Sequence, residues 1–155
     1  MNNENYSSLL LENQLCFPLY AASREIIKRY KPFLDEIGLT YTQYIAMMIL
    51  WERKTVTACE MGKLLFLDSG TLTPLLKSME KSGLVIRQRC KSDERCLTVS
   101  ITEKGMMLRN KAAEIPKKMS DCVGICSEEA SVLYDLLYKI LGKDSPVPEK
   151  FSDGK

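Results

Sequence analysis

Residues 67–102 constrain the fold of this chain most, because a helical pattern there leads directly into a strand hairpin. Asp68 and Ser69 have short side-chain oxygens that can accept a backbone N–H and so begin a helix. The apolar residues that follow have the spacing of one buried helix face: Leu72, Leu75, Leu76 and Met79. Gly83, which tolerates a positive φ, is expected to end the helix.

Two short strands are predicted after this helix, at 84–90 and 96–102. Leu97, Val99 and Ile101 alternate with hydroxyl side chains, which is the period of a half-buried strand. The tip between the strands, KSDER, is short and charged, so we expect a hairpin. A helix with a polar outer face followed by a basic hairpin is the layout of a winged helix-turn-helix, which predicts a DNA-docking unit.

The composition is that of an ordinary globular domain, with 155 residues, 45% of them hydrophobic and 27% charged. No apolar run approaches the roughly 18 residues of a membrane helix, and no signal-peptide pattern opens the chain, so we expect a cytoplasmic protein. The net charge of +2 is too small to indicate nucleic acid by itself. The chain has no histidine, which excludes Ser-His-Asp and Cys-His nucleophile systems and argues against zinc and iron sites. We expect no cofactor and no metal.

A long first helix is predicted from Asn13 to Ile37. Pro18 must lie near its start, and Pro32 is expected to interrupt and kink its far end, because proline lacks the backbone N–H of a helix interior. Residues 1–11, rich in Asn and Ser, are expected to form a disordered tail, as are residues 143–155, which include two prolines.

Capping patterns predict the next two helices. Thr40 with Gln43, and Thr57 with Glu60, fit the capping box, in which the threonine bonds forward and the longer side chain bonds back. The helix that begins after Thr40, over 41–52, is expected to supply core residues: Ile45, Met48, Ile49 and Trp51. The helix that begins after Thr57 is short, and it forms the helix-turn-helix pair with the helix that follows Asp68.

Two more helices are predicted after the hairpin. Thr102 caps a long one that is bent or broken near Pro116, and Ser127 caps a last one that ends near Gly142. The terminal helices carry three apolar stripes: Leu15, Leu19, Ala22, Ile26 and Tyr30; Leu108, Ala112, Ile115 and Met119; and Leu133, Leu136, Leu137, Ile140 and Leu141.

These stripes favour a two-fold dimer, which would bury them and place two recognition helices at the spacing of a palindromic operator. The alternative is that they pack within one monomer. We therefore predict a mostly α-helical fold with a small antiparallel β-hairpin wing. A winged helix-turn-helix over 40–102 lies in a single subunit, 12–142, of a helical homodimer that pairs through helices of 12–37 and 103–142.

Six motifs, taken with their order and spacing, match a known family: LENQLCF at 11–17, Tyr-Lys-Pro at 30–32, TYTQY at 40–44, LDSGTLTPLLKSME at 67–80, DER at 93–95 and SITEKG at 100–105. With them the chain resembles the MarR-type transcriptional repressors, and within these the organic hydroperoxide resistance regulators, over about residues 11–142. The resemblance implies an all-α dimer with a winged helix-turn-helix in each subunit. It also implies a repressor released from a pseudo-palindromic operator on double-stranded DNA when organic hydroperoxide oxidises a cysteine.

The resemblance implies that this sensor is Cys16, with Tyr20, Tyr30 and Tyr41 around its thiolate. The chemistry of the residues agrees, since Cys16 falls near the positive end of a helix dipole and tyrosine hydroxyls can donate to a thiolate. Peroxide would then oxidise the sulfur to a sulfenic acid. From spacing alone, the alternative is that Cys16 is a small buried hydrophobe among core aromatics.

Cys122 and Cys126 lie where two-cysteine members of the family place a resolving cysteine, so the resemblance implies that either could form a disulfide with Cys16 of the partner subunit. The alternative is that both are packing residues. The remaining cysteines are expected to be reduced, with structural roles only: Cys59 as core of the short helix, and Cys90 and Cys96 beside the wing tip. The alternative for Cys90 and Cys96 is that they face each other across the hairpin.

The outward face of the recognition helix offers side chains for phosphates and base edges: Ser69, Thr71, Thr73, Pro74 and Lys77. Arg87 and Arg89 are expected to face the DNA backbone. Asp93 is expected to hold Arg95 for the minor groove, as in the family's D-x-R wing. The alternative is a solvated basic hairpin.

Two rival functions come from other classes. A thiol peroxidase would use Cys16 catalytically, but the sequence has no electron-delivery motif, so we expect no enzyme activity. A repressor gated by a small aromatic ligand in the dimer cleft would not need Cys16 at all.

Overall fold

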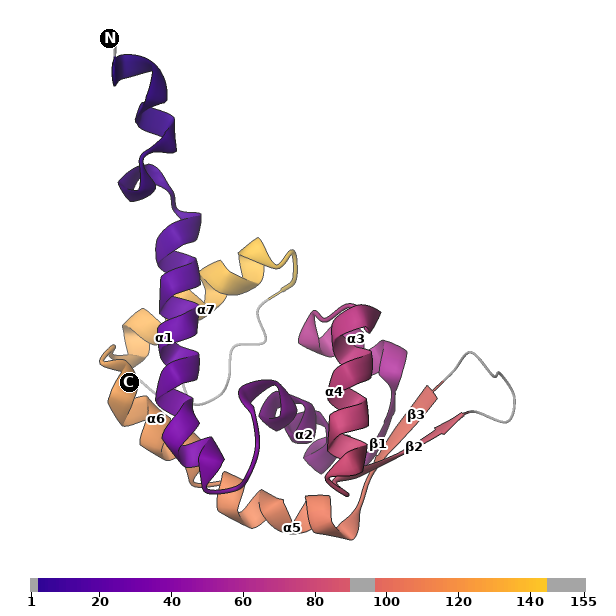
Figure 1. The fold of residues 1–155 in the computed structure, drawn as a ribbon. Helices are drawn as coiled ribbons and strands as arrows, with labels where there is room; N and C mark the ends of the chain where they lie inside the picture. Colours follow the sequence, from indigo (N-terminus) through magenta and orange to yellow (C-terminus); the bar gives the residue numbers. More distant parts are fainter. Residues whose placement is uncertain (1–2, 90–96, 145–155) are drawn as a thin grey trace. The chain divides into compact units, whose positions relative to one another are not determined.

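The computed structural model describes residues 3–89 and 97–144, and Figure 1 shows how its elements follow one another. The chain divides into two compact units, residues 1–119 and 120–155, which are described separately. The predicted single subunit over 12–142 stays a prediction. In the described ranges, no helix is both long and apolar enough to cross a membrane.

The first unit begins with two short 3₁₀ helices, Asn3–Leu9 and Leu11–Asn13, where the sequence predicts a disordered tail. Helix α1 follows over Cys16–Asp35, with Pro18 as its third residue, in the first turn as predicted. The predicted interruption at Pro32 is wrong, because the helix continues through it. Pro32 lies in the last turn, where its missing N–H removes a single hydrogen bond.

The winged helix-turn-helix follows α1 in the order α2, Tyr41–Arg53; α3, Ala58–Leu65; and α4, Ser69–Lys81. The capping box before α2 is confirmed: Thr40 Oγ1 accepts the Gln43 N–H at 3.3 Å, and Gln43 Oε1 accepts the Thr40 N–H at 2.9 Å. Before α4, Asp68 Oδ1 accepts the Thr71 N–H at 2.8 Å. These local bonds explain why the helix starts are readable from sequence.

The buried face of α2 differs from the prediction except at Trp51. Met48 is 44% exposed, and Ile45 and Ile49 are half-buried. The residues that are buried instead are Gln43, Tyr44, Ala46, Met47 and Leu50. When a helix is apolar on nearly all sides, its packing partners determine which side is buried. In α2 the Trp51 indole N–H donates to the Gly105 carbonyl at 2.9 Å, which orients the helix.

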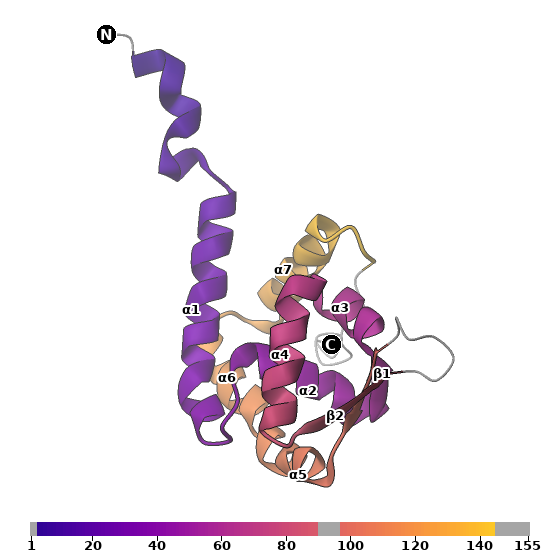
Figure 2. The same ribbon diagram turned by 45° about the vertical axis from the view of Figure 1, so that its right-hand side comes forward.

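The wing belongs to a three-stranded antiparallel sheet of order β1-β3-β2. Its strands are β1, Thr55–Thr57; β2, Val85–Arg89; and β3, Leu97–Ile101. The two predicted strands are thus confirmed where the structure describes them, with Leu84 and Thr102 left outside the strands, and Val99 of the central strand is fully buried. Strand β1 was not predicted. Its three residues are too short a run to show a strand pattern, and they are held in the sheet by backbone pairing with β3. Figures 1 and 2 show α2, α3 and α4 grouped beside this sheet.

The predicted break near Pro116 is confirmed, since α5 spans Glu103–Ala112 and α6 spans Ile115–Val123 across the boundary between the units. In the second unit, α7 spans Ser127–Ile140. Cys126, not Ser127, is its N-cap residue, and the Cys126 N–H donates to Glu129 Oε2 at 2.9 Å. No residue of α7 is buried.

Candidate functional site

Cys16 is the first residue of α1, and its side chain is exposed. No hydrogen bond joins its sulfur to another of the described residues. Its position at the helix start agrees with the prediction, but the thiol faces solvent within a single chain. It is therefore open to a small oxidant.

Tyr30 and Tyr41 come together where α1 lies against the start of α2, with their ring centroids 5.1 Å apart. Tyr44 joins them, 5.9 Å from Tyr30 and only 2% exposed. Burial raises the pKa of Tyr30 and of Tyr41, and it raises the pKa of Tyr44 to about 12. All three phenols therefore stay protonated at neutral pH and can donate a hydrogen bond. The sequence analysis missed Tyr44, although TYTQY contains it.

The structure does not bring Cys16 to these rings within one chain. Tyr30 stands 14 residues after Cys16 on the same uninterrupted helix. At a rise of 1.5 Å per residue, that places them about 21 Å apart along the helix axis. Tyr20 is one turn from Cys16, and its hydroxyl accepts a hydrogen bond from Arg24 Nη1 at 2.6 Å.

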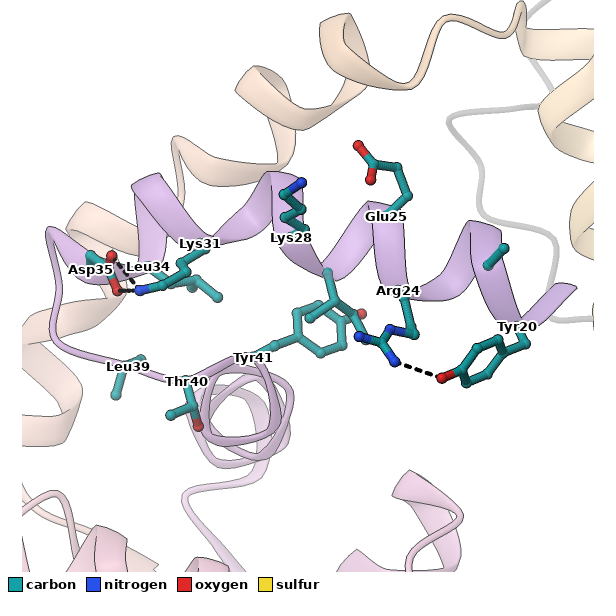
Figure 3. Close-up of a pocket in the computed structure, with 12 residues that line it drawn as sticks. Tyr20, Arg24, Glu25, Lys28, Lys31, Leu34, Asp35, Leu39, Thr40 and Tyr41 are labelled. Carbon is teal, nitrogen blue, oxygen red and sulfur yellow. Dashed lines mark hydrogen bonds and ion pairs between the residues drawn. The ribbon is translucent and has the colours of Figure 1, made fainter. Parts of the chain in front are cut away.

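A groove of about 770 Å³ lies between α1 and the start of α2 (Figure 3). Tyr20 and Tyr41 line it but Cys16 does not. The Arg24–Tyr20 bond lies at one end of this groove and the Lys31–Asp35 ion pair, 2.7 Å long, at the other. Its remaining lining mixes apolar side chains with cations: Ala21, Ile27, Leu34, Leu39 and Lys28 among them. Such a groove suits an aromatic or apolar segment.

All five side chains predicted on the outward face of α4 are exposed: Ser69, Thr71, Thr73, Pro74 and Lys77. On the opposite face Leu72, Leu76 and Met79 are buried, which fixes the orientation of the helix. In the helix-turn-helix pair of α3 and α4, the outward face of α4 is thus exposed and can contact a partner.

Arg87 on β2 is tied to Glu80 on α4, although the sequence analysis placed it toward DNA. Glu80 Oε2 accepts from Arg87 Nε at 2.9 Å and Nη2 at 2.7 Å, while Oε1 accepts the Arg87 backbone N–H at 3.1 Å. These bonds lower the pKa of the Glu80 carboxyl. Arg89 is exposed, whereas Asp93, Arg95, Cys90 and Cys96 lie outside the described residues.

Cys122 and Cys126 are both exposed, one on α6 and one at the start of α7. The backbone N–H of Glu129 lowers the pKa of the Cys126 thiol, but the Glu128 carboxylate, desolvation and the Glu129 carboxylate together outweigh it, so the pKa is raised. Cys59 is also exposed, so the prediction that it is core of the short helix is wrong. Its side chain lies on the outer face of α3, on the side of the helix away from the buried Met61.

Comparisons with known proteins agree on one kind of molecule. A family model described as the transcriptional regulator SarA/Rot matches residues 28–112. A protein of Bacillus subtilis (strain 168) named organic hydroperoxide resistance transcriptional regulator is 48% identical over 136 residues, which cover 88% of this chain and 92% of the relative.

Solved structures of AbfR, a protein of Staphylococcus epidermidis, are similar over nearly the whole chain. Reduced AbfR bound to DNA has a TM-score of 0.73 at 35% identity, over 91% of this chain and 98% of the other. Overoxidised AbfR bound to DNA has the same TM-score and identity, over 89% and 97%. The disulfide form of AbfR has a TM-score of 0.59 at 35% identity, over 92% and 97%.

Proposed function

This chain belongs to the organic hydroperoxide resistance branch of the MarR-type transcriptional regulators, and we propose that it is a DNA-binding repressor that senses peroxide through Cys16. The observation that carries the proposal is an exposed thiol at the first residue of α1, in a chain that also holds a winged helix-turn-helix. The thiolate attacks the terminal oxygen of an organic hydroperoxide, the O–O bond breaks, and the products are a sulfenic acid and an alcohol.

The repressor is a homodimer. In α7 the side chains of Leu133, Leu136 and Ile140 are 44%, 53% and 63% exposed, and Leu15, the residue just before α1, is 79% exposed. So much exposed apolar surface is unfavourable in water, and a two-fold partner covers it while pairing two recognition helices.

The dimer also completes the sensor. Because about 21 Å of helix separates Cys16 from Tyr30, a thiolate can receive hydrogen bonds from Tyr30 and Tyr41 only if they belong to a second copy. Two α1 helices that run antiparallel would bring the Cys16 end of one against the Tyr30 and Tyr41 end of the other. The groove between α1 and α2 has the apolar lining and the volume to receive that segment.

DNA is bound by α4 and the wing. The exposed hydroxyls and Lys77 of α4 face the major groove and its phosphates. Arg89 adds a cation on β2, and Arg95 with Asp93 is proposed for the minor groove. Arg87 acts from within the protein, since its guanidinium is bound to Glu80.

Release requires a disulfide. In the similar protein AbfR an overoxidised form is bound to DNA, and a disulfide form also exists. We therefore assign release to a disulfide from Cys16 to Cys122 or Cys126 of a second copy. As a DNA-bound regulator the chain acts in the cytoplasm, and it consumes peroxide once per switching event without turnover as an enzyme.

The test is a band shift on the DNA upstream of the chain's own gene, with and without cumene hydroperoxide. The reduced protein should shift the DNA, and the oxidant should abolish the shift. Cys16→Ser should bind the same DNA and ignore the oxidant. If that variant is still released, Cys16 is not the sensor.

A second candidate is a repressor gated by a small aromatic acid, which the groove favours through Arg24, Lys28 and Tyr41. This function predicts that a compound such as 4-hydroxybenzoate releases DNA from Cys16→Ser as readily as from the wild type. Release that occurs with hydroperoxide alone, and only when Cys16 is present, rejects it.

A further inference from the structure

Gln43 is a buried polar residue at the start of α2, 8% exposed, and both ends of its amide are bonded. Its Oε1 accepts the Thr40 N–H at 2.9 Å, and its Nε2 donates to Ser78 Oγ on α4 at 3.1 Å. The orientation of the amide follows from chemistry, because a backbone N–H can only donate and the amide oxygen must therefore face Thr40.

The two ends of this bridge belong to different parts of the molecule. Tyr41 and Tyr44, whose rings lie against that of Tyr30, are within two residues of Gln43 on the first turn of α2. Ser78 lies one residue after Lys77 on the recognition helix. The amide of Gln43 therefore joins the turn of α2 that carries Tyr41 and Tyr44 to the helix proposed to read DNA.

The neighbouring packing is of a different kind. The other buried side chains of α2 and α4 are mostly apolar, Met47, Leu76 and Met79 among them. Apolar packing is non-directional and tolerates a small slide or rotation, whereas a hydrogen bond loses strength once its angle or length changes. Among these contacts, the amide bridge is the one that specifies the register of α4 on α2.

We infer that Gln43 is a positioning residue, which through Ser78 makes the recognition helix follow movements of the tyrosine cluster. This inference rests on the proposed function, since the movement it transmits is the response to Cys16 oxidation. Without the bridge, α4 would keep its DNA-binding position while the sensor changes state. The reduced protein would still bind its operator.

The decisive variant is Ser78→Ala, which removes the bridge and leaves the capping box of α2 intact. The quantity measured is the ratio of operator Kd after cumene hydroperoxide to Kd before it. Loss of the bond should lower this ratio by roughly 2- to 12-fold, the factor corresponding to one neutral hydrogen bond. Ser78→Thr, which keeps a hydroxyl, should retain the wild-type ratio. Ser82→Ala, a matched serine change at the end of the same helix, should retain it too.

Two further measurements separate the possible failures. The rate of Cys16 oxidation, followed by thiol labelling, should be equal in all variants. If the wild type is not released by hydroperoxide, the proposed function fails. If the wild type is released and Ser78→Ala has the wild-type ratio, or loses affinity equally in both states, Gln43 is only a structural residue. In Gln43→Ala, adding Ser78→Ala should change the ratio no further, and an additional drop would contradict the shared bond.

Discussion

At the scale of single residues, Gly105 shows how a motif can be structural rather than functional. A Cβ at this position would lie 2.5 Å from the Leu84 carbonyl oxygen and 2.9 Å from Ile101 Cγ1. Gly105→Ala should therefore lower the free energy of unfolding by about 1–3 kcal/mol, the usual cost of overpacking, as measured by urea denaturation. Gly70→Ala is the control and should cost less, because a Cβ there would lie 3.0 Å from Asp68 Oδ1, the end of an exposed side chain, which is easier to displace than a backbone carbonyl. An equal loss at both positions would contradict the explanation.

The same residues explain the SITEKG motif. Thr102 Oγ1 donates to the Gly83 carbonyl and accepts the Gly105 N–H, while Lys104 Nζ donates to the Ser82 carbonyl at 2.7 Å. The motif thus fastens the end of α4 to the start of α5. A sequence pattern identifies Thr102 as a cap, but the roles of Lys104 and Gly105 depend on segments about 20 residues away.

At the scale of elements, the Glu80–Arg87 ion pair joins α4 to the wing strand β2. Side-chain hydrogen bonds from Arg87 lower the pKa of Glu80, so the pair stabilises the fold above the ordinary glutamate pKa of 4.5. That stabilisation is lost as the pH falls through the lowered value in the folded state. Glu80→Gln should therefore be less stable than the wild type at pH 7, and the difference should shrink on acidification, as followed by thermal unfolding.

The control for this ion pair is Glu52→Gln, since Glu52 is exposed and has no ion-pair partner among the described residues. This variant should have the same pH dependence as the wild type. A pH-independent difference for Glu80→Gln would show that the carboxylate charge is not what joins α4 to β2.

The salt dependence of operator binding tests whether the recognition helix α4 contacts DNA phosphates. Lys77 is exposed on α4, and a lysine bound to a DNA phosphate releases a counterion on binding. Lys77→Ala should weaken operator binding across sequences and reduce the slope of log K against log salt by about 1. Lys111→Ala, an exposed lysine on α5, should leave the slope unchanged. A slope that Lys77→Ala does not change would remove this residue from the DNA interface.

The helix starts could be predicted from sequence because they depend on local chemistry, whereas the buried helix faces and the sensor site depend on packing between distant segments. The caps at Thr40, Asp68 and Thr102 depend on residues three positions away, so the sequence contains them fully. The face of α2 was missed because Ile45 and Met48 are as apolar as Met47 and Leu50, which are buried instead. At the site, the family resemblance placed Tyr30 beside Cys16, but a continuous α1 separates the two residues within one chain.

At the scale of the whole molecule, the dimer can be tested on α7. Leu136 is 53% exposed, so Leu136→Glu should leave a single chain folded. In a dimer seam the same carboxylate would be buried without a partner, which costs several kcal/mol, so the variant should sediment as a monomer and bind the palindrome weakly. Lys139→Glu, the same charge on the exposed polar side of α7, should stay dimeric. A dimeric Leu136→Glu would place the interface elsewhere.

The last prediction concerns how oxidation becomes release. Moving a population from about 99% bound to 99% free requires a preference of about 5.5 kcal/mol for the non-binding form. A sulfenate adds little more than one oxygen to Cys16, whereas a disulfide is a covalent bond that holds the helices that carry it in a new arrangement. In that second step the sulfur of Cys122 or Cys126 attacks the sulfenic acid, an S–S bond forms, and water leaves.

The protein with both Cys122→Ser and Cys126→Ser should therefore form the sulfenate at the wild-type rate yet remain on its operator. The wild type should show a disulfide-linked dimer on a non-reducing gel as the DNA is released. Comparing the single variants Cys122→Ser and Cys126→Ser should show which cysteine forms the disulfide with Cys16. Adding a small thiol such as cysteine to the double variant should restore release through a mixed disulfide. Prompt release of the double variant by cumene hydroperoxide alone would mean that neither thiol is needed and that the sulfenate itself changes the spacing of the recognition helices.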